Sequence, residues 1–157
     1  MNPADFIRLI APAAQASADK TGIPASFTIA QAALESGWGS SLLATEAKNL
    51  FGVKADKSWT GDVWLHNTRE FLHGKWVVVE AKWRKYADWQ GCMDDHAEFL
   101  TSNPRYKAAF DCGRGDDFCR AIAKAGYATD PTYAEKIISI IHGRNLQILD
   151  TPHGRIA

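Results

Sequence analysis

The sequence lacks the features that mark several specialised classes of protein. It contains only three cysteines, Cys92, Cys112 and Cys119, which are too few and too irregularly spaced for a disulfide scaffold. Neither sign of charge is in excess, because 18 Lys and Arg residues balance 18 Asp and Glu residues. This balance is unlike the basic surface of a duplex-binding protein, and no apolar run approaches the roughly 20 residues that cross a bilayer. We therefore expect a chain that binds no nucleic acid and has no integral membrane segment.

The N-terminus also lacks the pattern of a secretory signal peptide. Asp5 and Arg8 stand where such a peptide needs an uninterrupted apolar core, and no basic leader precedes them. These residues are therefore expected to belong to the folded protein. We therefore expect a chain that is either cytoplasmic or exported by a route that uses no cleaved signal.

Two pairs of residues are close enough in sequence to form a disulfide or to bind a metal ion together. Cys112 and Cys119 either form one disulfide in an oxidising compartment or remain free, partly buried thiols. Cys92 and His96 are four residues apart, which would place two metal ligands on one helix face. No CxxC pair and no second histidine at ligand spacing accompanies them, so we expect no metal site and no other cofactor.

The chain has an ordinary globular composition with an excess of tryptophan. Its 157 residues are 46% apolar and 23% charged, which fits one folded domain. Six tryptophans exceed the usual frequency, and such a ring either stacks on the faces of sugars or bases or fills the core of a small protein. Trp38, Trp59 and Trp64 are candidates for the first role, whereas Trp83 and Trp89 are expected in the core or at its rim.

Apolar periodicity and turn residues predict a mainly helical α+β domain over residues 1–150. Seven segments have helical patterns: 2–21, 24–36, 41–47, 88–100, 105–110, 116–126 and 131–149. Asp130 and Pro131 are expected to open the last of these helices as N-cap and first residue. Two runs rich in β-branched and aromatic residues, 63–72 and 75–84, flank His73-Gly74 and predict one β-hairpin. The tail, residues 151–157, is expected to be frayed.

Glu35 is a candidate general acid. Acid catalysis of glycoside hydrolysis needs a raised pKa and a rigid position beside the scissile oxygen. Glu35 lies in the last turn of a predicted helix, where unpaired carbonyls and the negative end of the helix dipole disfavour a carboxylate. Its apolar neighbours Ala32, Leu34 and Trp38 act in the same direction, and SGWG at 36–39 predicts a sharp turn that opens the helix end to a ligand. The alternative is a surface glutamate that happens to end a helix.

Glu70 is a second candidate and lies in the predicted hairpin. Strand alternation places it on one face with Thr68, His66 and Trp64. A carboxylate beside a hydroxyl, an imidazole and an indole suits the wall of a sugar groove. The alternative is a solvent-facing glutamate on a half-exposed strand.

Four segments together resemble glycoside hydrolase family 73, the bacterial endo-β-N-acetylglucosaminidases of flagellar assembly, autolysis and phage lysis. They are AQAALESGWG, NLFGVKA, the TREF hairpin and AGYATDPTYAEKI, and the resemblance covers about residues 4–149. It implies a lysozyme-like fold, in which a helical body and one β-hairpin lobe flank a substrate groove. It also implies that the enzyme acts on the glycan strands of peptidoglycan and cuts the β-1,4 bond after N-acetylglucosamine, where this sugar joins N-acetylmuramic acid.

The resemblance implies roles for three residues. Glu35 matches the family's general acid, Glu70 its second, hairpin-borne carboxylate, and Tyr127 of GYATDP the tyrosine that lines the cleavage site. Phe71 stands where the family often has tyrosine, which removes a phenol but leaves the neighbouring carboxylate in place. Inversion, a covalent intermediate and participation of the substrate's acetamide all remain open.

Further substrate contacts are expected from side chains along the groove: Trp38, Asn49, Trp59, Trp64 and Thr68. Asn49 precedes Leu50-Phe51-Gly52 and either bonds a sugar acetamide or caps a turn.

Two other functions stay open beside the glucosaminidase. A lytic transglycosylase of the same fold uses one glutamate and leaves a 1,6-anhydro sugar, and a wall-binding module needs no catalytic carboxylate. Glu70 and the GYATDP motif favour the hydrolase. We expect a monomeric phage or prophage endolysin, made in the cytoplasm and acting on the periplasmic wall after release. An injected antibacterial effector and a flagellar wall hydrolase are the alternative settings.

Overall fold

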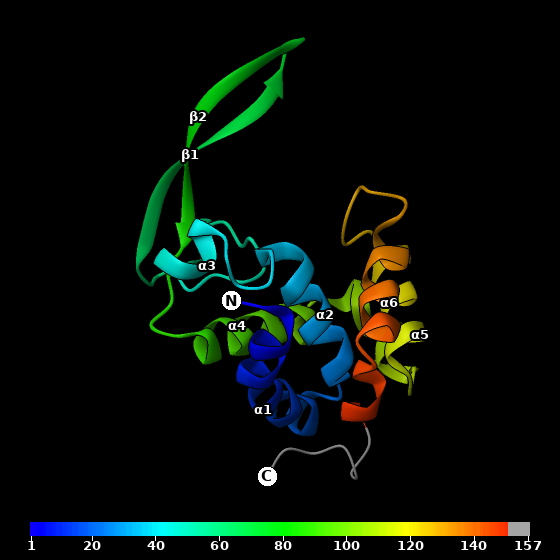
Figure 1. Ribbon diagram of the computed structural model, residues 1–157. Helices are drawn as coiled ribbons and strands as arrows, with labels where there is room; N and C mark the ends of the chain where they lie inside the picture. Colours follow the sequence, from blue (N-terminus) through cyan, green and yellow to red (C-terminus); the bar gives the residue numbers. More distant parts are fainter. Residues whose placement is uncertain (151–157) are drawn as a thin grey trace.

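The computed structural model describes residues 1–150, in which a helical body carries one projecting β-hairpin (Figure 1). Six α-helices and two 3-10 helices in these residues form the body, and the two strands form the hairpin. The predicted mainly helical α+β class is thus confirmed. None of the helices in this part of the chain is long and apolar enough to cross a membrane. The tail that was expected to be frayed, residues 151–157, lies outside the described residues.

The first three helices lie where the sequence predicts them. Helix α1 covers Pro3–Thr21, and the side chain of Asn2 caps its first turn by accepting a backbone hydrogen bond of 2.9 Å. Gly22 ends the helix in the left-handed region, with φ of 81°. Helix α2 follows over Ala25–Ser36 and the short helix α3 over Leu42–Glu46.

The hairpin has the predicted strands and turn. Strand β1 covers Val63–Leu72 and pairs antiparallel with strand β2, Lys75–Arg84. His73 and Gly74 both have positive φ, at 52° and 78°, as a two-residue hairpin turn of the right twist requires. The hairpin bends away from the body, and its outer end stands free at the top of Figure 1. Four large apolar side chains on this outer part are exposed: Phe71, Leu72, Trp76 and Val78.

Five elements follow the hairpin: α4 (Trp89–Ser102), η1 (Pro104–Asp111), α5 (Gly115–Lys124), α6 (Tyr133–Gly143) and η2 (Leu146–Asp150). The predicted start of the last helix at Pro131 was wrong, because the Asp130 carboxylate closes a turn ahead of the helix. It accepts hydrogen bonds from the Thr132 amide at 2.8 Å and from Lys136 Nζ at 2.6 Å. The predicted helical segment 105–110 is a 3-10 helix, and the single helix predicted over 131–149 divides into α6 and the 3-10 helix η2.

Helix α2 is the centre of the core. Ten of its twelve residues are buried, and α1, α6 and η2 pack against it. A helix covered on nearly every side has an almost unbroken run of small and apolar residues, as the segment FTIAQAA shows. The C-terminal end of α2 comes to the surface on the side from which the hairpin projects (Figure 1). This end carries Glu35.

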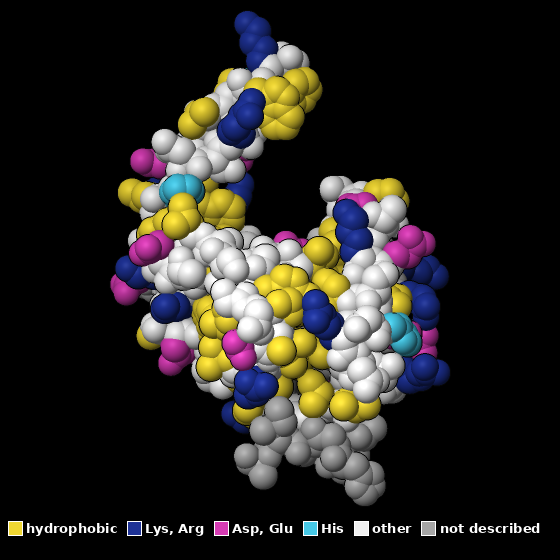
Figure 2. Space-filling view, viewed as in Figure 1, with side chains coloured by type: hydrophobic (Ala, Val, Ile, Leu, Met, Phe, Trp, Pro, Cys, Tyr) yellow, Lys and Arg dark blue, Asp and Glu magenta, His cyan; other side chains and the backbone are white. Residues whose placement is uncertain are grey.

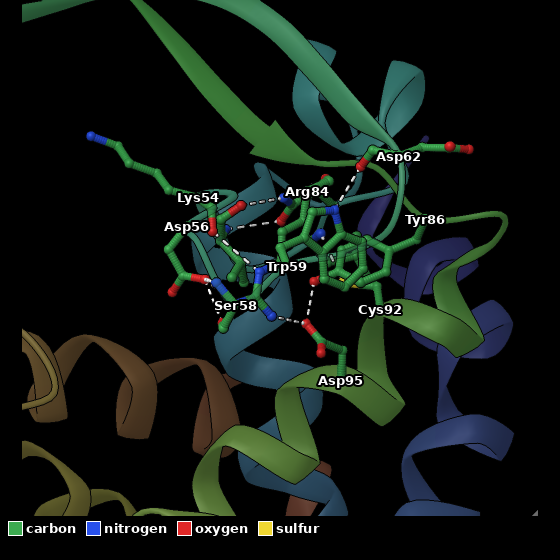
Figure 3. Close-up of polar contacts among 12 residues, drawn as sticks. Lys54, Asp56, Ser58, Trp59, Asp62, Arg84, Tyr86, Cys92 and Asp95 are labelled. Carbon is green, nitrogen blue, oxygen red and sulfur yellow. Dashed lines mark hydrogen bonds and ion pairs between the residues drawn. The ribbon is translucent and has the colours of Figure 1, made fainter.

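A polar cluster joins the base of the hairpin to α4 (Figure 3). Arg84 donates to the Asp95 carboxylate at 2.8 Å, and the Tyr86 hydroxyl donates to the same carboxylate at 2.6 Å. The Arg84 guanidinium also lies over the ring of Trp59, 4.9 Å from its centroid. Charge-assisted hydrogen bonds in a half-buried setting are comparatively strong, so they hold the hairpin lobe in a fixed orientation on the body.

The three cysteines are free thiols, so the structure shows the second of the two alternatives for Cys112 and Cys119. Cys92 and Cys119 are buried, and burial raises the pKa of each thiol to about 12. A thiol that stays protonated at neutral pH is unreactive. Both residues therefore act as small core side chains.

Candidate active site

Glu35 stands at the end of α2, where a tight turn fixes the backbone. Gly37 ends the helix in the left-handed region, with φ of 58°. The buried Ser36 hydroxyl donates to a helix carbonyl one turn back at 2.6 Å and accepts from the Gly39 amide at 2.8 Å. A Cβ at Gly39 would lie 2.9 Å from the ring of Phe6, so this position requires glycine. The sharp turn predicted from SGWG is confirmed, and it presents the Glu35 carboxyl from a rigid helix end.

A hollow separates the hairpin from the lobe formed by α5, α6 and the loop before α6 (Figure 2). On the body, a cavity of about 440 Å³ adjoins that loop and is bordered by residues 51–54, α4 and Tyr127. Its lining combines aromatic rings such as Phe51 with charged side chains such as Lys54 and Arg105. Rings beside a few polar groups suit a ligand with both apolar faces and hydroxyls, such as a sugar.

The surroundings of Glu35 raise the pKa of its carboxyl above the ordinary value. Desolvation is the main cause, and the hydrogen bond from Tyr133 acts in the opposite direction. The Tyr133 hydroxyl donates to Glu35 Oε1 at 3.1 Å. The side chain as a whole remains exposed, so a ligand can reach the carboxyl. An accessible carboxylic acid that keeps its proton to higher pH is what general acid catalysis requires.

Tyr127 lies beside this pair of residues. Its ring stacks on that of Tyr133, with centroids 5.7 Å apart and planes at 29°. Burial, followed by the charge of Glu35, raises the pKa of the Tyr127 phenol. The phenol therefore stays protonated at neutral pH. Because Tyr133 contacts both Glu35 and Tyr127, the structure brings these two residues into one site.

Glu70 lies on the strand face that alternation predicts. Trp64, Thr68 and Glu70 are half-buried, whereas the residues between them are exposed. Trp64 stacks on a neighbouring histidine, with ring centroids 4.6 Å apart. The Glu70 carboxylate forms an ion pair of 3.2 Å with Lys54. Within the described residues no hydrogen bond or ion pair joins Glu70 to Glu35, and its role as second carboxylate stays a prediction.

Trp38 and Trp59, both expected to stack on sugar, are engaged within the protein. Trp38 packs edge-on against Phe6, with centroids 6.0 Å apart, and the Arg144 guanidinium lies 5.2 Å from the Trp38 ring centroid. Trp59 donates from its indole nitrogen to a loop carbonyl at 2.8 Å and is covered in part by Arg84. Both rings thus have packing partners within the protein, and their contact with substrate stays a prediction.

Of the two roles expected for Asn49, the structure shows the capping of a turn and not an amide that is free to bond a sugar. It is 1% exposed, and its amide nitrogen donates to the carbonyls of Val53 at 2.9 Å and Arg84 at 3.0 Å. Its amide oxygen accepts from the Val53 amide at 3.1 Å. Both amide hydrogens are used, so Asn49 fixes the loop that borders the cavity and has no donor left for a sugar acetamide.

Three residues near the acid were not among the candidates from sequence: Gln31, Tyr133 and His96. Gln31 is four residues before Glu35, so the helical repeat places both on one face of α2. Tyr133 belongs to the AGYATDPTYAEKI segment. His96 entered the sequence analysis only for its spacing from Cys92, and in the structure its Nε2 lies 2.7 Å from Gln31 Oε1.

The described residues contain no group of three or more His, Cys, Asp or Glu side chains that could hold a metal ion. Cys92 Sγ accepts a hydrogen bond from the Leu50 amide at 3.3 Å. The ring of His96 stacks on Phe51, with centroids 3.9 Å apart. Cys92 and His96 are therefore both engaged in packing and hydrogen bonds.

Comparison with known proteins identifies relatives over most of the chain. The family model named Glucosaminidase, described as mannosyl-glycoprotein endo-beta-N-acetylglucosaminidase, matches residues 11–146. Peptidoglycan hydrolase FlgJ of Vibrio parahaemolyticus is 40% identical over 143 residues, which cover 88% of this chain and 46% of that protein. Exo-glucosaminidase LytG of Bacillus subtilis is 39% identical over 150 residues, which cover 92% of this chain and 52% of that protein. The chain spans about half the length of these curated relatives.

A solved structure has the same fold. The C-terminally truncated glycoside hydrolase domain of Salmonella typhimurium FlgJ superposes with a TM-score of 0.81 at 37% identity. The match covers 92% of this chain and 99% of that domain. The arrangement of a helical body with one hairpin lobe is thus shared with a glycoside hydrolase domain.

Proposed function

This chain belongs to glycoside hydrolase family 73, the glucosaminidases, and on that premise we propose that it hydrolyses the glycan strands of peptidoglycan. The proposed target is the β-1,4 bond after N-acetylglucosamine, where it joins N-acetylmuramic acid. The relative named peptidoglycan hydrolase supports this substrate class. The open hollow between hairpin and body supports cleavage within a strand, because an open groove accepts a polymer along its length (Figure 2).

The observation that carries this proposal is the state of Glu35. Its carboxyl has a raised pKa, is reachable from solvent and is held by Tyr133 at the end of a rigid helix. A glycosidic oxygen is a poor leaving group and must be protonated as its bond to the anomeric carbon breaks. Glu35 in its protonated form is the residue that we assign to this step.

The remaining chemistry needs two things. One is a group that stabilises the positive charge developing on the sugar ring, and the other is a water molecule that attacks the anomeric carbon. We assign Glu70 to activating that water or supporting the charge, and Tyr127 to lining the cleavage site. When the bond breaks, the Glu35 proton passes to the departing sugar. Water then adds its hydroxyl to the anomeric carbon; its proton passes to Glu70 where Glu70 activates the water, and to the Glu35 carboxylate where Glu70 only supports the charge. In each route open to this family member the first proton comes from Glu35.

One observation favours a second candidate reaction. The Glu70 carboxylate is engaged in an ion pair with Lys54, which an enzyme that works with a single glutamate would tolerate. A lytic transglycosylase uses one such acid and closes a 1,6-anhydro ring instead of adding water. The two reactions differ in their products, so product analysis separates them.

For the biological setting we propose a phage or prophage endolysin that acts as a monomer after release through a membrane pore. The wall-degrading relative supports the site of action. Expression of the chain in a bacterial host with and without a pore-forming protein tests the setting. Lysis that depends on the pore supports an endolysin, and lysis that does not depend on it contradicts the proposal.

Mass spectrometry of fragments released from purified peptidoglycan tests the proposed reaction. We expect fragments that end in reducing N-acetylglucosamine. Fragments that end in a 1,6-anhydro sugar would instead establish the transglycosylase, and fragments that end in reducing N-acetylmuramic acid would contradict the proposed bond.

A further inference from the structure

A line of hydrogen bonds runs from Glu35 into the core. The Tyr133 hydroxyl donates to Glu35 Oε1 at 3.1 Å, and Gln31 Nε2 donates to the Tyr133 oxygen at 2.8 Å. At its inner end Gln31 Oε1 lies 2.7 Å from His96 Nε2. Gln31, His96 and Tyr133 are 0%, 4% and 5% exposed, so water does not replace these contacts. Helices α2, α6 and α4 each contribute to the line.

The chemistry of these groups gives the line a direction. The Gln31 amide nitrogen only donates, and the Tyr133 oxygen accepts from it. The Gln31 amide oxygen only accepts, so His96 must carry a proton on Nε2. The single hydroxyl hydrogen of Tyr133 is then directed to Glu35. The opposite orientation of the Gln31 amide would reverse every bond and require an unprotonated Nε2.

The surroundings of His96 keep its ring neutral. Phe51 stacks on it at 3.9 Å, and Tyr127 and Phe99 lie against it at 6.0 and 6.4 Å between centroids. Asp95 is the charged group whose field reaches the ring. Burial outweighs that field and lowers the pKa of His96 to about 4. A neutral imidazole with one hydrogen can act as the fixed donor that starts the line.

We propose that Gln31 and His96 are positioning residues that direct the acidic proton of Glu35 toward the substrate. The Tyr133 hydrogen occupies the Oε1 side of the carboxyl, which leaves the proton of protonated Glu35 on Oε2. Without Gln31, the Tyr133 oxygen becomes a free acceptor, and Glu35 can donate its proton to Tyr133 and away from the glycosidic oxygen. This inference rests on the proposed role of Glu35 as general acid.

Two titratable groups face Glu35, Tyr133 from α6 and Tyr127 from the loop before it. Burial raises the pKa of both phenols, so neither ionises at neutral pH. The alkaline limb of a pH–rate profile therefore reports Glu35 itself. A shift of this limb therefore reports a change in the pKa of Glu35. A loss of folded protein lowers the rate at every pH and does not shift the limb.

Gln31→Met tests the centre of the line, because it keeps the side-chain length and removes both hydrogen bonds. On purified peptidoglycan we expect kcat to fall roughly ten- to hundred-fold with KM little changed. We also expect the alkaline limb to move to higher pH, because Tyr133 becomes a weaker donor to the Glu35 carboxylate. Wild-type kcat, or a loss of rate with an unmoved alkaline limb, would overturn the proposal.

Two variants of His96 separate positioning from packing. His96→Leu removes the donor, whereas His96→Gln places an amide donor near the Nε2 position. We expect His96→Leu to shift the limb as Gln31→Met does, and His96→Gln to recover most of the rate. Ile29→Val, a buried change on α2 outside the line, is the control for lost packing and should leave the limb in place. Equal losses in both His96 variants with an unmoved limb would show a merely structural residue.

Nitrogen-15 NMR of the wild-type histidine rings needs neither a variant nor an assay. We expect His96 to carry its proton on Nε2 and to stay neutral from about pH 8 to pH 5. A proton on Nδ1 alone would mean the reversed line and would overturn the proposal. If this tautomer is found but the wild-type protein does not degrade peptidoglycan, the proposed function fails while the hydrogen-bond line stands.

Discussion

The hydroxyl of Tyr133 donates to Oε1 of Glu35 at 3.1 Å across 98 positions of sequence. This contact ties the start of α6 to the end of α2. Since Tyr127 stacks on Tyr133, the same contact also places the loop before α6 beside the acid. The helical body, and not the hairpin, therefore fixes the geometry of the proposed general acid.

The raised pKa of Glu35 predicts how stability depends on pH. A carboxyl whose folded pKa lies above its unfolded value near 4.5 favours the folded state below that value. This contribution is lost as the pH rises through the folded pKa, because ionisation then opposes folding. Glu35→Gln cannot ionise, so it should melt up to a few degrees above the wild type at about pH 8, with most of the difference gone at about pH 4. Calorimetry at the two pH values measures this, and a variant that melts below the wild type at about pH 8 would contradict it.

Glu70→Gln should be damaged but measurable, because the substrate's own acetamide can share the role of a second carboxylate. The loss of rate should be smaller than that of Glu35→Gln and the melting temperature should stay within a few degrees, since exposed ion pairs stabilise by only about 1 kcal/mol or less. Turnover of purified peptidoglycan measures the effect. Lys54→Met is the matched control, because it breaks the same ion pair and keeps the carboxylate. An unchanged Glu70→Gln enzyme would make Glu70 a wall of the groove.

Trp64→Ala should weaken the binding of chitooligosaccharides by about 1–2 kcal/mol, the scale of one lost aromatic contact. The ring lies on the half-buried face of β1 with Thr68 and Glu70, where sugar would pass. Quenching of indole fluorescence on titration measures the affinity. An unchanged affinity would assign Trp64 to the packing of the hairpin.

Trp59→Ala should lower stability as well as affinity. The Trp59 indole donates a hydrogen bond to the loop at 2.8 Å and packs against the Arg84 guanidinium that anchors the hairpin. We expect a loss of about 2 kcal/mol in the free energy of unfolding, below the roughly 3–5 kcal/mol of a fully buried tryptophan. Urea unfolding followed by circular dichroism measures it. A variant of wild-type stability would show that this indole does not support the loop.

The elements that sequence predicted well are those fixed by local chemistry. Asn2 and Gly22 cap α1 through their own conformational preferences, and His73-Gly74 forms a turn that almost any flanking strands would share. Asp130 shows the limit of such signals. Asp-Pro opens a helix or closes a turn equally well, and hydrogen bonds from Thr132 and Lys136 decide for the turn.

The environment of the acid could be predicted only in part. The pKa of Glu35 is raised by desolvation, the effect that its apolar neighbours in the sequence predict. Its partners do not, since Tyr133 is 98 residues away and the contact of Gln31 with His96 spans 65 residues. No periodicity or spacing rule relates positions on different helices, so the hydrogen-bond line appears only once the helices are packed.

Treatment with a chelator should leave activity unchanged. The described residues hold no cluster of metal ligands, and Cys92 and His96 are engaged with Leu50 and Gln31. Release of soluble fragments from peptidoglycan, with and without EDTA, measures the effect. Activity that disappears with EDTA and returns with zinc would contradict a reaction carried by carboxyl groups alone.

The turnover of purified peptidoglycan by Glu35→Gln tests the proposed acid most directly. The substitution keeps the shape of the side chain and removes its proton, and no neighbouring group can replace it. We expect kcat to fall by more than the roughly 10²–10⁴-fold typical of one proton-transfer catalyst. The alkaline limb of the residual pH profile should disappear, while circular dichroism shows a folded protein. A folded Glu35→Gln enzyme with near-normal turnover would contradict the mechanism.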